Sequence, residues 1–266
     1  MITPAEFASR HRPGKPLLLP NAWDGASARW LAARGHDAIG TTSLGVAIAN
    51  GLRDGSGEAA DVTMRLAEQL TAAGVGITVD IESGFSDDPD EVAGYARRLA
   101  ALGVLGLNVE DSDASGELID PDLAAAKVAA IRAAAPELFV NARTDAFWIE
   151  AGGSVAEREA TAVERARRYV AAGASGVFVP GALPLEAIAR LASRVGAPLN
   201  VLVQADAGFG DLAASGAARV STGSLLFRAA LGAIDDAVAG ALGSTEHVPG
   251  GIPSYADVVA LAGGDS

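Results

Sequence analysis

The stretch Ala73-Gly74-Val75-Gly76-Ile77-Thr78-Val79-Asp80 contains the unit that decides the fold. An alanine-rich, helix-like segment ends at Gly74, two small residues follow, and a short β-branched run ends in a polar residue. Glycine is favoured just after a helix because it accepts a left-handed backbone there. The run that follows is too short and too β-branched for a helix, so the stretch predicts a helix followed by a strand.

The same unit recurs four more times along the chain, at Gly35, Gly103, Gly173 and Gly216. Together with an early apolar run, the pattern predicts eight strands, at residues 17–19, 38–42, 77–81, 106–110, 139–142, 176–179, 199–203 and 219–221. Apolar residues at three-to-four spacing predict helices over 61–73, 90–101, 122–135, 154–172, 185–194 and 225–242. The interval at 211–215 allows about one helical turn, and a short helix is expected over 255–262.

Alternating strands and helices over 266 residues predict an α/β fold, a (β/α)8 TIM-type barrel. The competing doubly wound sheet requires a glycine-rich phosphate loop after an early strand, and Leu19-Pro20-Asn21-Ala22-Trp23 is not one. We assign residues 1–242 to the barrel and 243–266 to a C-terminal extension that packs on its own or a neighbouring subunit.

Composition restricts the class of partner. The net charge of −13 and the pI near 4.6 argue against nucleic acid and acidic membranes as partners, and favour a small substrate. The absence of cysteine excludes disulfides, thiolate metal sites and a cysteine nucleophile. No apolar run reaches the roughly 18 residues of a membrane span, and no basic-then-apolar leader is seen, so we expect a cytoplasmic protein. Half of the residues are hydrophobic and few are aromatic, which predicts a core of Ala, Val, Leu and Ile, with His11, His36 and His247 on the surface.

Acidic residues follow the predicted strands at the end where parallel barrels carry their sites. Asp80 and Glu82 close one strand, where positions i and i+2 point the same way. Glu110 closes the neighbouring strand, about 4.8 Å away, and Asp54 lies in the preceding loop. Converging carboxylates with no Lys or Arg between them repel one another unless a cation is bound, and oxygen ligands favour Mg²⁺, with Mn²⁺ as an alternative. Helix capping is the competing role for such residues, and it is the expected one for Asp87, Asp88 and Asp90.

Two further stretches point to an anionic substrate. Arg143 ends the strand at 139–142, where its guanidinium can grip a carboxylate or phosphate, or can pair with Asp145 or Glu110. The turn Thr41-Thr42-Ser43 offers hydroxyl and N–H groups for an anionic oxygen. A metal, an arginine and an N–H pocket suit a small dianionic 2-oxo acid, with an enolate stabilised by the metal. The reaction class that follows is making or breaking the bond beta to the keto group.

Five ordered stretches together resemble the isocitrate lyase/phosphoenolpyruvate mutase superfamily, over about residues 10 to 235. They are Leu19-Pro20-Asn21-Ala22-Trp23-Asp24, Gly51-Leu52-Arg53-Asp54, Val79-Asp80-Ile81-Glu82-Ser83-Gly84-Phe85, Asn108-Val109-Glu110-Asp111 and Asn141-Ala142-Arg143-Thr144-Asp145. The resemblance implies a modified barrel whose eighth helix is exchanged between subunits, which gives a homodimer or a homotetramer.

The resemblance also implies roles for individual residues. Asp80 would hold Mg²⁺, and its water shell would be ordered by Asp54, Glu82 and Glu110. Thr42, Ser43 and Arg143 would contact the substrate, and we add Leu44 and Gly45 of the same turn. Trp23 is a further substrate-binding candidate, with core packing as an equal alternative. The candidate catalytic residues are Arg143, Glu110 and Asp54.

The loop Ser112-Asp113-Ala114-Ser115-Gly116-Glu117-Leu118-Ile119-Asp120 departs from the superfamily pattern. Isocitrate and methylisocitrate lyases carry a Lys-Arg/Lys-Cys-Gly-His-type loop here, so a cysteine-dependent lyase is not expected. The mutase and phosphonopyruvate hydrolase subtypes carry Lys and Asn, which are also absent. Ser112, Ser115 or Glu117 would have to replace the missing acid/base.

The sequence therefore predicts a Mg²⁺-dependent lyase or phosphonomutase-like enzyme. It would act on a small 2-oxo or 2-hydroxy carboxylate, or a phosphonate, by C–C or P–C cleavage through an enolate-type intermediate. Oxaloacetate decarboxylase-like activity is an alternative, because decarboxylation needs only enolate stabilisation and a later proton, and no special residue of the altered loop. A catalytically degenerate carboxylate-binding barrel is a second alternative. A third is a phosphate-binding barrel that uses Gly208-Phe209-Gly210 and Thr222-Gly223-Ser224.

Overall fold

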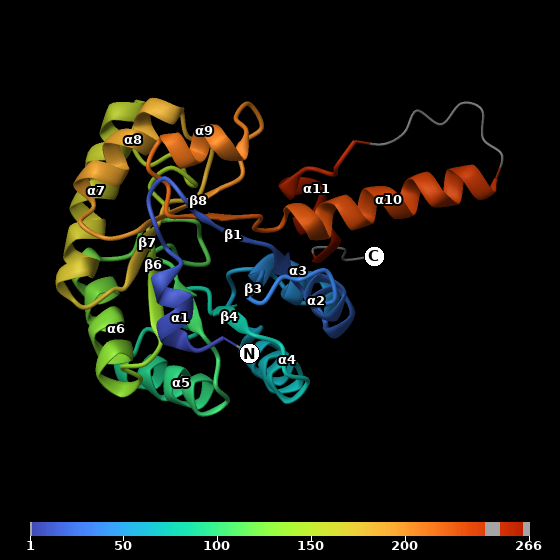
Figure 1. Cartoon of the computed structure of the whole chain (residues 1–266), viewed down its shortest axis with the longest axis horizontal. Coiled ribbons are helices and arrows are strands. Elements are labelled where there is room, and N and C mark those ends of the chain that lie inside the picture. The colour runs from blue at the N-terminus through green and yellow to red at the C-terminus, as the bar shows by residue number, and fades with distance from the viewer. Residues whose placement is uncertain (1, 243–250, 263–266) are drawn as a thin grey trace.

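The computed structural model describes residues 2–242 and 251–262, which form a TIM-type α/β barrel (Figure 1). All strand pairs are parallel, in the order β1-β9-β8-β7-β6-β5-β4-β3-β2. The strands are β1 Leu17–Leu19, β2 Asn21–Ala22, β3 Ile39–Thr41, β4 Ile77–Asp80, β5 Gly106–Val109, β6 Phe139–Arg143, β7 Gly176–Phe178, β8 Leu199–Leu202 and β9 Arg219–Ser221. The predicted fold class and the eight predicted strand positions are confirmed.

The barrel closes through residues 17–22, where Pro20 separates β1 from β2. β1 pairs with β9 and β2 pairs with β3, so one continuous segment joins the two ends of the sheet. Proline has no N–H for the ladder, but the carbonyl of Pro20 accepts from the Gly40 N–H at 2.9 Å. The sequence predicts only the strand at residues 17–19, and β2 after Pro20 is an addition that the structure shows.

The helices cover the outside of the barrel. They are α1 Pro4–Ser9, α2 Gly25–Ala32, α3 Ser43–Ala49, α4 Ala60–Ala72, α5 Pro89–Ala101, α6 Pro121–Ala134, α7 Val155–Ala171, α8 Leu185–Arg194, α9 Phe209–Ala214, α10 Leu225–Ala241 and α11 Tyr255–Val259, with a 3₁₀ turn at Ala260–Ala262. All five glycines of the repeated unit have positive φ, as predicted for helix ends. The sequence did not predict α1 or α3, and it indicated α2 only as the helix-like segment that ends at Gly35.

The aliphatic core lies between the strands and the helices, whereas the barrel interior is partly polar. Leu107 and Val140 belong to a large buried cluster with residues of α4, α5 and α6. Inside the barrel, Asn141 donates to Asn108 Oδ1 at 2.9 Å, and Arg219 of β9 reaches the same oxygen from the opposite side at 3.4 Å. Burial lowers the pKa of Arg219 to about 9.

His11 is buried, not on the surface as predicted. Its ring stacks on Phe139, with ring centroids 4.0 Å apart, and it lies edge-on to Phe7 of α1. Burial lowers the pKa of His11 to about 3, so the ring is neutral at physiological pH. His36 is half-buried, and His247 lies outside the described residues.

Helix α10 projects from the barrel, and α11 returns to the barrel beside α3 (Figure 1). Val258 of α11 is buried against Leu44 and Phe227. The domain division at residue 242 stays a prediction, because residues 243–250 and 263–266 of the predicted extension lie outside the described residues. Within the described ranges, no helix is long and apolar enough to cross a membrane.

Candidate functional site

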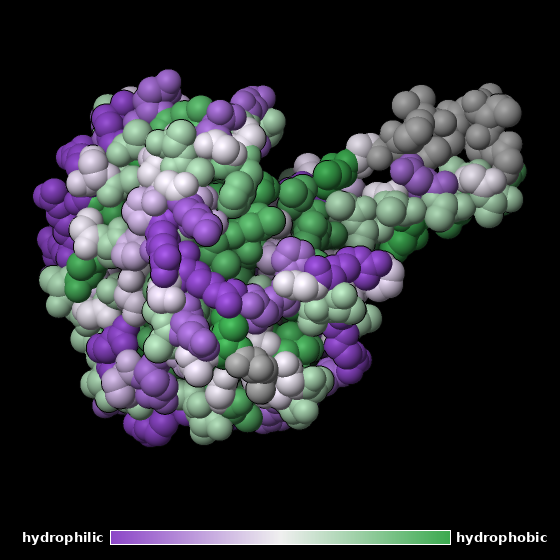
Figure 2. All heavy atoms as spheres, viewed as in Figure 1, coloured by the Kyte–Doolittle hydropathy of each residue, from purple (hydrophilic) through white to green (hydrophobic). Residues whose placement is uncertain are grey.

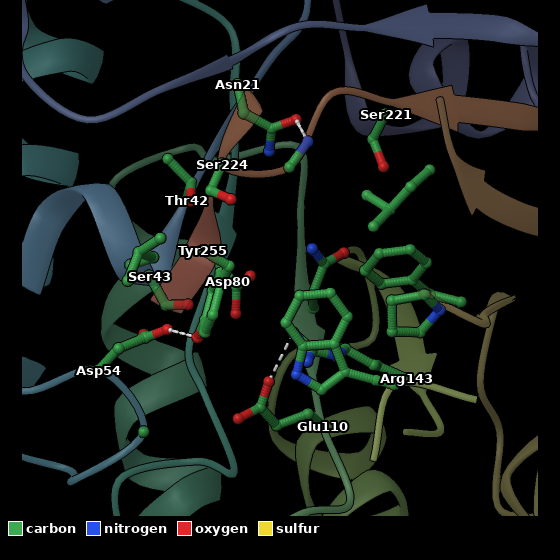
Figure 3. Close-up of a pocket in the computed structure, with 18 of the residues that line it drawn as sticks. Asn21, Thr42, Ser43, Asp54, Asp80, Glu110, Arg143, Ser221, Ser224 and Tyr255 are labelled. Atoms are coloured by element: carbon green, nitrogen blue, oxygen red, sulfur yellow. Dashed lines mark hydrogen bonds and ion pairs between the residues drawn. The ribbon is translucent and has the colours of Figure 1, made fainter. Parts of the chain in front are cut away.

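A cavity of about 530 Å³ lies at the carboxyl ends of the strands (Figure 3). Seven of the predicted site residues line it, namely Thr42, Ser43, Leu44, Asp54, Asp80, Glu110 and Arg143. Trp23, Gly45 and Glu82 are not among the lining residues. The structure thus brings together side chains from five parts of the chain, and it places most of the predicted set at one point.

Asp80 is the last residue of β4, and it faces the cavity. Its backbone N–H donates to Thr41 Oγ1 of the neighbouring strand at 2.9 Å, which fixes the strand end. Burial raises the pKa of Asp80 to about 6, and the nearby charge of Arg143 opposes that rise. Placing a full negative charge here without a cation is therefore costly.

The prediction that Glu82 lies beside Asp80 on one strand face is wrong. The strand ends at Asp80, and Glu82 has a left-handed backbone with φ of 51°, so the i and i+2 rule for strands does not apply. Its carboxylate accepts from the Gly57 N–H at 2.9 Å, which ties it to the loop that follows Asp54. Burial raises the pKa of Glu82 to about 7, and its Oε1 atom is buried without a hydrogen-bond partner.

Arg143 lies between two carboxylates, which corrects the expectation of an acidic cluster without a cation. Its Nη1 is 2.7 Å from Glu110 Oε2 and its Nε is 2.6 Å from Asp145 Oδ1. The guanidinium carbon lies 5.8 Å from the Trp148 ring centroid and 5.7 Å from that of Phe178. Burial raises the pKa of Glu110 well above its usual range, although Arg143 lowers it.

A buried network holds Asp145, and through it Arg143. Ser112 Oγ donates to Asp145 Oδ2 at 2.5 Å, and the Asp145 N–H donates to Asp111 Oδ1 at 2.8 Å. Tyr169 and Arg165 of α7 donate to the other Asp111 oxygen at 2.6 and 3.0 Å. The arginine is therefore positioned by residues on three elements.

The altered loop after β5 lines the cavity with Ser112, Asp113, Ala114 and Gly116. Its two ends pair at Ser112 and Leu118, and the Asp113 carboxylate accepts hydrogen bonds from Ser115. Of the three candidate acid/base residues in this loop, Ser112 lines the cavity, whereas Ser115 and Glu117 do not. The Ser112 hydroxyl is engaged by Asp145, so it is not a free acid/base.

Asp54 has a partner that the sequence analysis missed. Tyr255 of α11 donates its hydroxyl to Asp54 Oδ2 at 2.6 Å, and both residues line the cavity. The Tyr255 ring packs edge-on against Trp148, with centroids 5.0 Å apart. Burial and the charge of Asp54 raise the pKa of Tyr255, so its hydroxyl stays protonated. The sequence carries no signal for this pair, because 201 positions separate the two residues.

The turn at Thr42 and Ser43 differs in detail from its predicted role. The Thr42 N–H donates to the Ala22 carbonyl at 3.1 Å, so it is part of the barrel and is not available to a ligand. A side chain at Gly45 would lie 2.7 Å from Trp23 Cβ, so the two residues pack against each other beside the cavity. Trp23 also packs on Phe227, with ring centroids 5.2 Å apart, which is the core-packing alternative.

The donor set fits a hydrated Mg²⁺ better than an ion that is fully enclosed by protein ligands. Within the part of the chain that the structure describes, no three His, Asp or Glu side chains are grouped to hold a metal by themselves. Asp54 Oδ1 and Glu82 Oε1 are nevertheless buried without hydrogen-bond partners among the described residues, and Asp80 faces the cavity between Asp54 and Glu110 (Figure 3). Mg²⁺ commonly keeps several waters and uses one or two carboxylates, which is what this arrangement offers.

Comparisons with known proteins bear on the family of this chain. A family model described as phosphoenolpyruvate phosphomutase matches residues 7–242. An uncharacterised protein of Mycobacterium tuberculosis is 42% identical over 254 residues, covering 96% of this chain and 95% of that protein. The 2-methylisocitrate lyase of Bacillus subtilis is 31% identical over 193 residues, which cover 69% of this chain and 61% of the lyase.

Solved structures show the same fold. A Burkholderia cenocepacia protein that is provisionally assigned as a phosphonomutase has a TM-score of 0.84 at 39% identity, and the match covers 89% of this chain and 98% of that one. A phosphonopyruvate hydrolase solved with oxalate and Mg²⁺ has a TM-score of 0.77 at 20% identity, covering 98% of this chain and 95% of that one. At that identity the second likeness shows the fold alone.

Proposed function

This chain belongs to the phosphoenolpyruvate phosphomutase family of the isocitrate lyase/phosphoenolpyruvate mutase superfamily, and we propose that it is a Mg²⁺-dependent enzyme of the lyase or mutase type. Its substrate would be a small 2-oxo or 2-hydroxy carboxylate or a phosphonate. The bond cleaved or transferred would be a C–C or P–C bond beta to the keto group. The observation that carries the proposal is the placement of Asp80, Asp54, Glu110 and Arg143 around one cavity at the carboxyl ends of the strands.

Asp80, Asp54 and Glu110 would hold the hydrated ion, with Glu82 supporting the loop beside them. A bound Mg²⁺ supplies Lewis-acid stabilisation of negative charge that develops on a keto oxygen. The phosphonopyruvate hydrolase of the same fold was solved with oxalate and Mg²⁺, and oxalate resembles the enolate of pyruvate. That structure supports oxalate with Mg²⁺ as a test ligand, but it does not say which reaction this chain catalyses.

Arg143 would orient the substrate carboxylate. Two of its nitrogens bind Glu110 and Asp145, which leaves Nη2 as the donor for the substrate. A guanidinium fixed in this way binds a carboxylate with little loss of side-chain freedom. The Trp148 and Phe178 rings beside it reduce access of water and so strengthen that contact.

Oxaloacetate decarboxylase-like activity remains the second candidate, because decarboxylation needs enolate stabilisation and a later proton but no nucleophile from the loop after β5. Ser112, the loop hydroxyl at the cavity, is already bound to Asp145, which favours a reaction with modest demands on this loop. A carboxylate-binding barrel without catalysis is the alternative from another class. It would bind oxalate but turn over none of the substrates.

Helix α10 supports an assembly of several copies. Its outer half exposes Ile234, Val238 and Leu242, with exposed fractions of 56%, 55% and 79%, and the helix projects from the barrel (Figure 2). We propose that this face packs on a second copy of the chain in a homodimer or homotetramer, with α10 exchanged between subunits. Burial of such residues at an interface contributes the hydrophobic stabilisation that the lone chain lacks.

A substrate screen tests the proposed activity. The purified protein is incubated with Mg²⁺ and oxaloacetate, 2-methylisocitrate, 2,3-dimethylmalate or phosphonopyruvate, and the products are quantified by NMR. We expect turnover of at least one compound of this class that is lost in Asp80→Asn and retained in Asp90→Asn, an exposed carboxylate outside the cavity. Equal turnover by native protein and Asp80→Asn would contradict the proposed role of Asp80.

A further inference from the structure

The cavity has two walls of different chemical kinds. Asp54, Asp80 and Glu110 lie on the side of β4 and β5. The other side, formed by β7, β8, the loop after β6 and the start of α10, presents apolar side chains, which are Trp148, Ile149, Phe178, Pro180, Leu202 and Leu225. The volume of about 530 Å³ lies in the range that holds ligands much larger than a three-carbon acid. The apolar wall therefore has room for a part of the substrate beyond the 2-oxo acid head.

Gln204 and Ser221, two polar side chains beside the apolar wall, are already hydrogen-bonded within the protein. The Gln204 side chain accepts from the Leu183 N–H at 2.9 Å and donates to the carbonyls of Gly181 and Leu202, both at 3.1 Å. The Ser221 hydroxyl donates to Asn200 Oδ1 at 3.2 Å. A charged ligand group placed against this wall would lose its hydration without gaining comparable hydrogen bonds.

Cations at the cavity are similarly engaged. Among the described residues that line it, Arg143 and Arg228 are the two basic ones. Arg143 is held by Glu110 and Asp145, and Arg228 donates to the Pro253 carbonyl at 2.7 Å and to Ser224 Oγ at 3.4 Å. After Arg143 has bound one substrate carboxylate, Arg228 could offer a second anionic group its Nη2 alone, because its Nε and Nη1 are bound by the chain, so the bidentate grip that favours a phosphonate is not available.

We propose that the substrate carries an uncharged, apolar substituent, alkyl or aryl, that lies against the wall of Trp148, Phe178 and Leu202. The inference rests on the proposed function, because the 2-oxo acid head must bind on the acidic side. It narrows that function to cleavage of a C–C bond in an alkyl- or aryl-substituted acid and disfavours phosphonates. Each methylene buried against the wall should tighten binding about fourfold, the factor that corresponds to about 0.8 kcal/mol per CH₂.

Calorimetric titration with oxamates tests the inference, because the chelating head stays constant while its N-substituent changes. The probes are oxamate, N-butyl oxamate and N-(2-carboxyethyl) oxamate, each titrated with and without Mg²⁺ into the full-length protein. We expect N-butyl oxamate to bind at least tenfold more tightly than oxamate, and the carboxyethyl compound to bind no more tightly than oxamate.

Two variants of one wall residue provide the matched control. Leu202→Asn places a polar group in the wall and should remove most of the gain from the butyl group, while Leu202→Met keeps the wall apolar and should retain it. In each variant the gain from the butyl group is measured relative to oxamate bound by that same variant. A carboxyethyl compound that binds more tightly than the butyl compound, or no gain from butyl in the native protein, would overturn the inference while leaving the proposed function intact. Failure of oxamate and oxalate alike to bind in the presence of Mg²⁺ would contradict both.

Discussion

The Tyr255 hydroxyl lies 2.6 Å from Asp54 Oδ2, which joins the C-terminal helix α11 to the acidic side of the cavity. The segment before the tyrosine is fixed as well, because Arg228 of α10 binds the Pro253 carbonyl and Ser254 caps α11. With Oδ2 occupied, the buried Oδ1 of Asp54 has no partner among the described residues. Tyr255 thus positions Asp54, and the C-terminal segment is part of the site.

Tyr255→Phe is expected to weaken Mg²⁺-dependent oxalate binding by roughly tenfold, because a hydrogen bond to a carboxylate contributes about 1.5–3 kcal/mol. The ring and its contact with Trp148 are retained in this variant. Tyr95→Phe is the matched control, since the Tyr95 hydroxyl donates to the Ala60 carbonyl outside the cavity. Titration calorimetry measures both variants, and equal affinities would show that Asp54 does not depend on Tyr255.

Arg143→Gln should destabilise the protein by about 3–5 kcal/mol, because it leaves Glu110 and Asp145 buried without their cation. Arg158→Gln removes an ion pair whose Glu150 partner is largely exposed, and it should cost less than about 1 kcal/mol. Urea denaturation of the two variants gives the comparison. Similar losses in both would mean that the pairs of Arg143 add little to the fold.

The stability of the metal-free protein should fall as the pH rises from about 5 to 7.5. The pKa of Asp80 is raised to about 6 and that of Glu82 to about 7, so in this window both groups bind more protons in the folded protein than in the unfolded chain. Buried His11, whose pKa is lowered to about 3, binds fewer protons in the folded protein and offsets part of this effect. Stability then decreases with pH, on the order of 2 kcal/mol for the Glu82 group. Thermal melting in EDTA measures the slope, which Glu82→Gln should reduce and the exposed change Glu164→Gln should not. A rise in stability over the same window would contradict these raised pKa values.

The apolar face of α10 predicts self-association. Native protein should run as a dimer or tetramer in light scattering, and Ile234→Asp with Val238→Asp should shift it towards the monomer. Trp30→Ser changes an exposed apolar residue on α2 and should leave the assembly unchanged. A monomeric native protein, or an assembly that resists the double change, would show that this face is not the interface.

The barrel was predictable because its signals are local. Each helix-ending glycine and each β-branched run can be read within about ten residues, and polar strand ends mark the site edge in any parallel barrel. Helices α1 and α3 were missed because they are short, and α3 begins within the Thr41-Thr42-Ser43 stretch that was interpreted as a binding turn.

The features of the site that could not be predicted from the sequence depend on backbone geometry or on contacts between distant residues. Glu82 leaves the strand direction through its left-handed backbone, which the alternation rule does not foresee. Arg143 pairs with both Glu110 and Asp145. From sequence spacing alone, an ion pair and a substrate contact were equally good explanations for this arginine. Tyr255 reaches the cavity only because α11 lies against α3 of the barrel, and this is a tertiary arrangement.

Thermal melting with oxalate tests the central claim most directly, on the native protein, Asp80→Asn and Asp90→Asn, each with and without Mg²⁺. Ligand at about 100 times its dissociation constant adds roughly 2.7 kcal/mol, or several degrees for a chain of this size. The account predicts stabilisation that requires both Mg²⁺ and Asp80 and is unaffected by Asp90→Asn. The absence of any shift in the native protein, or an equal shift in Asp80→Asn, would contradict a Mg²⁺-dependent enolate site in this cavity.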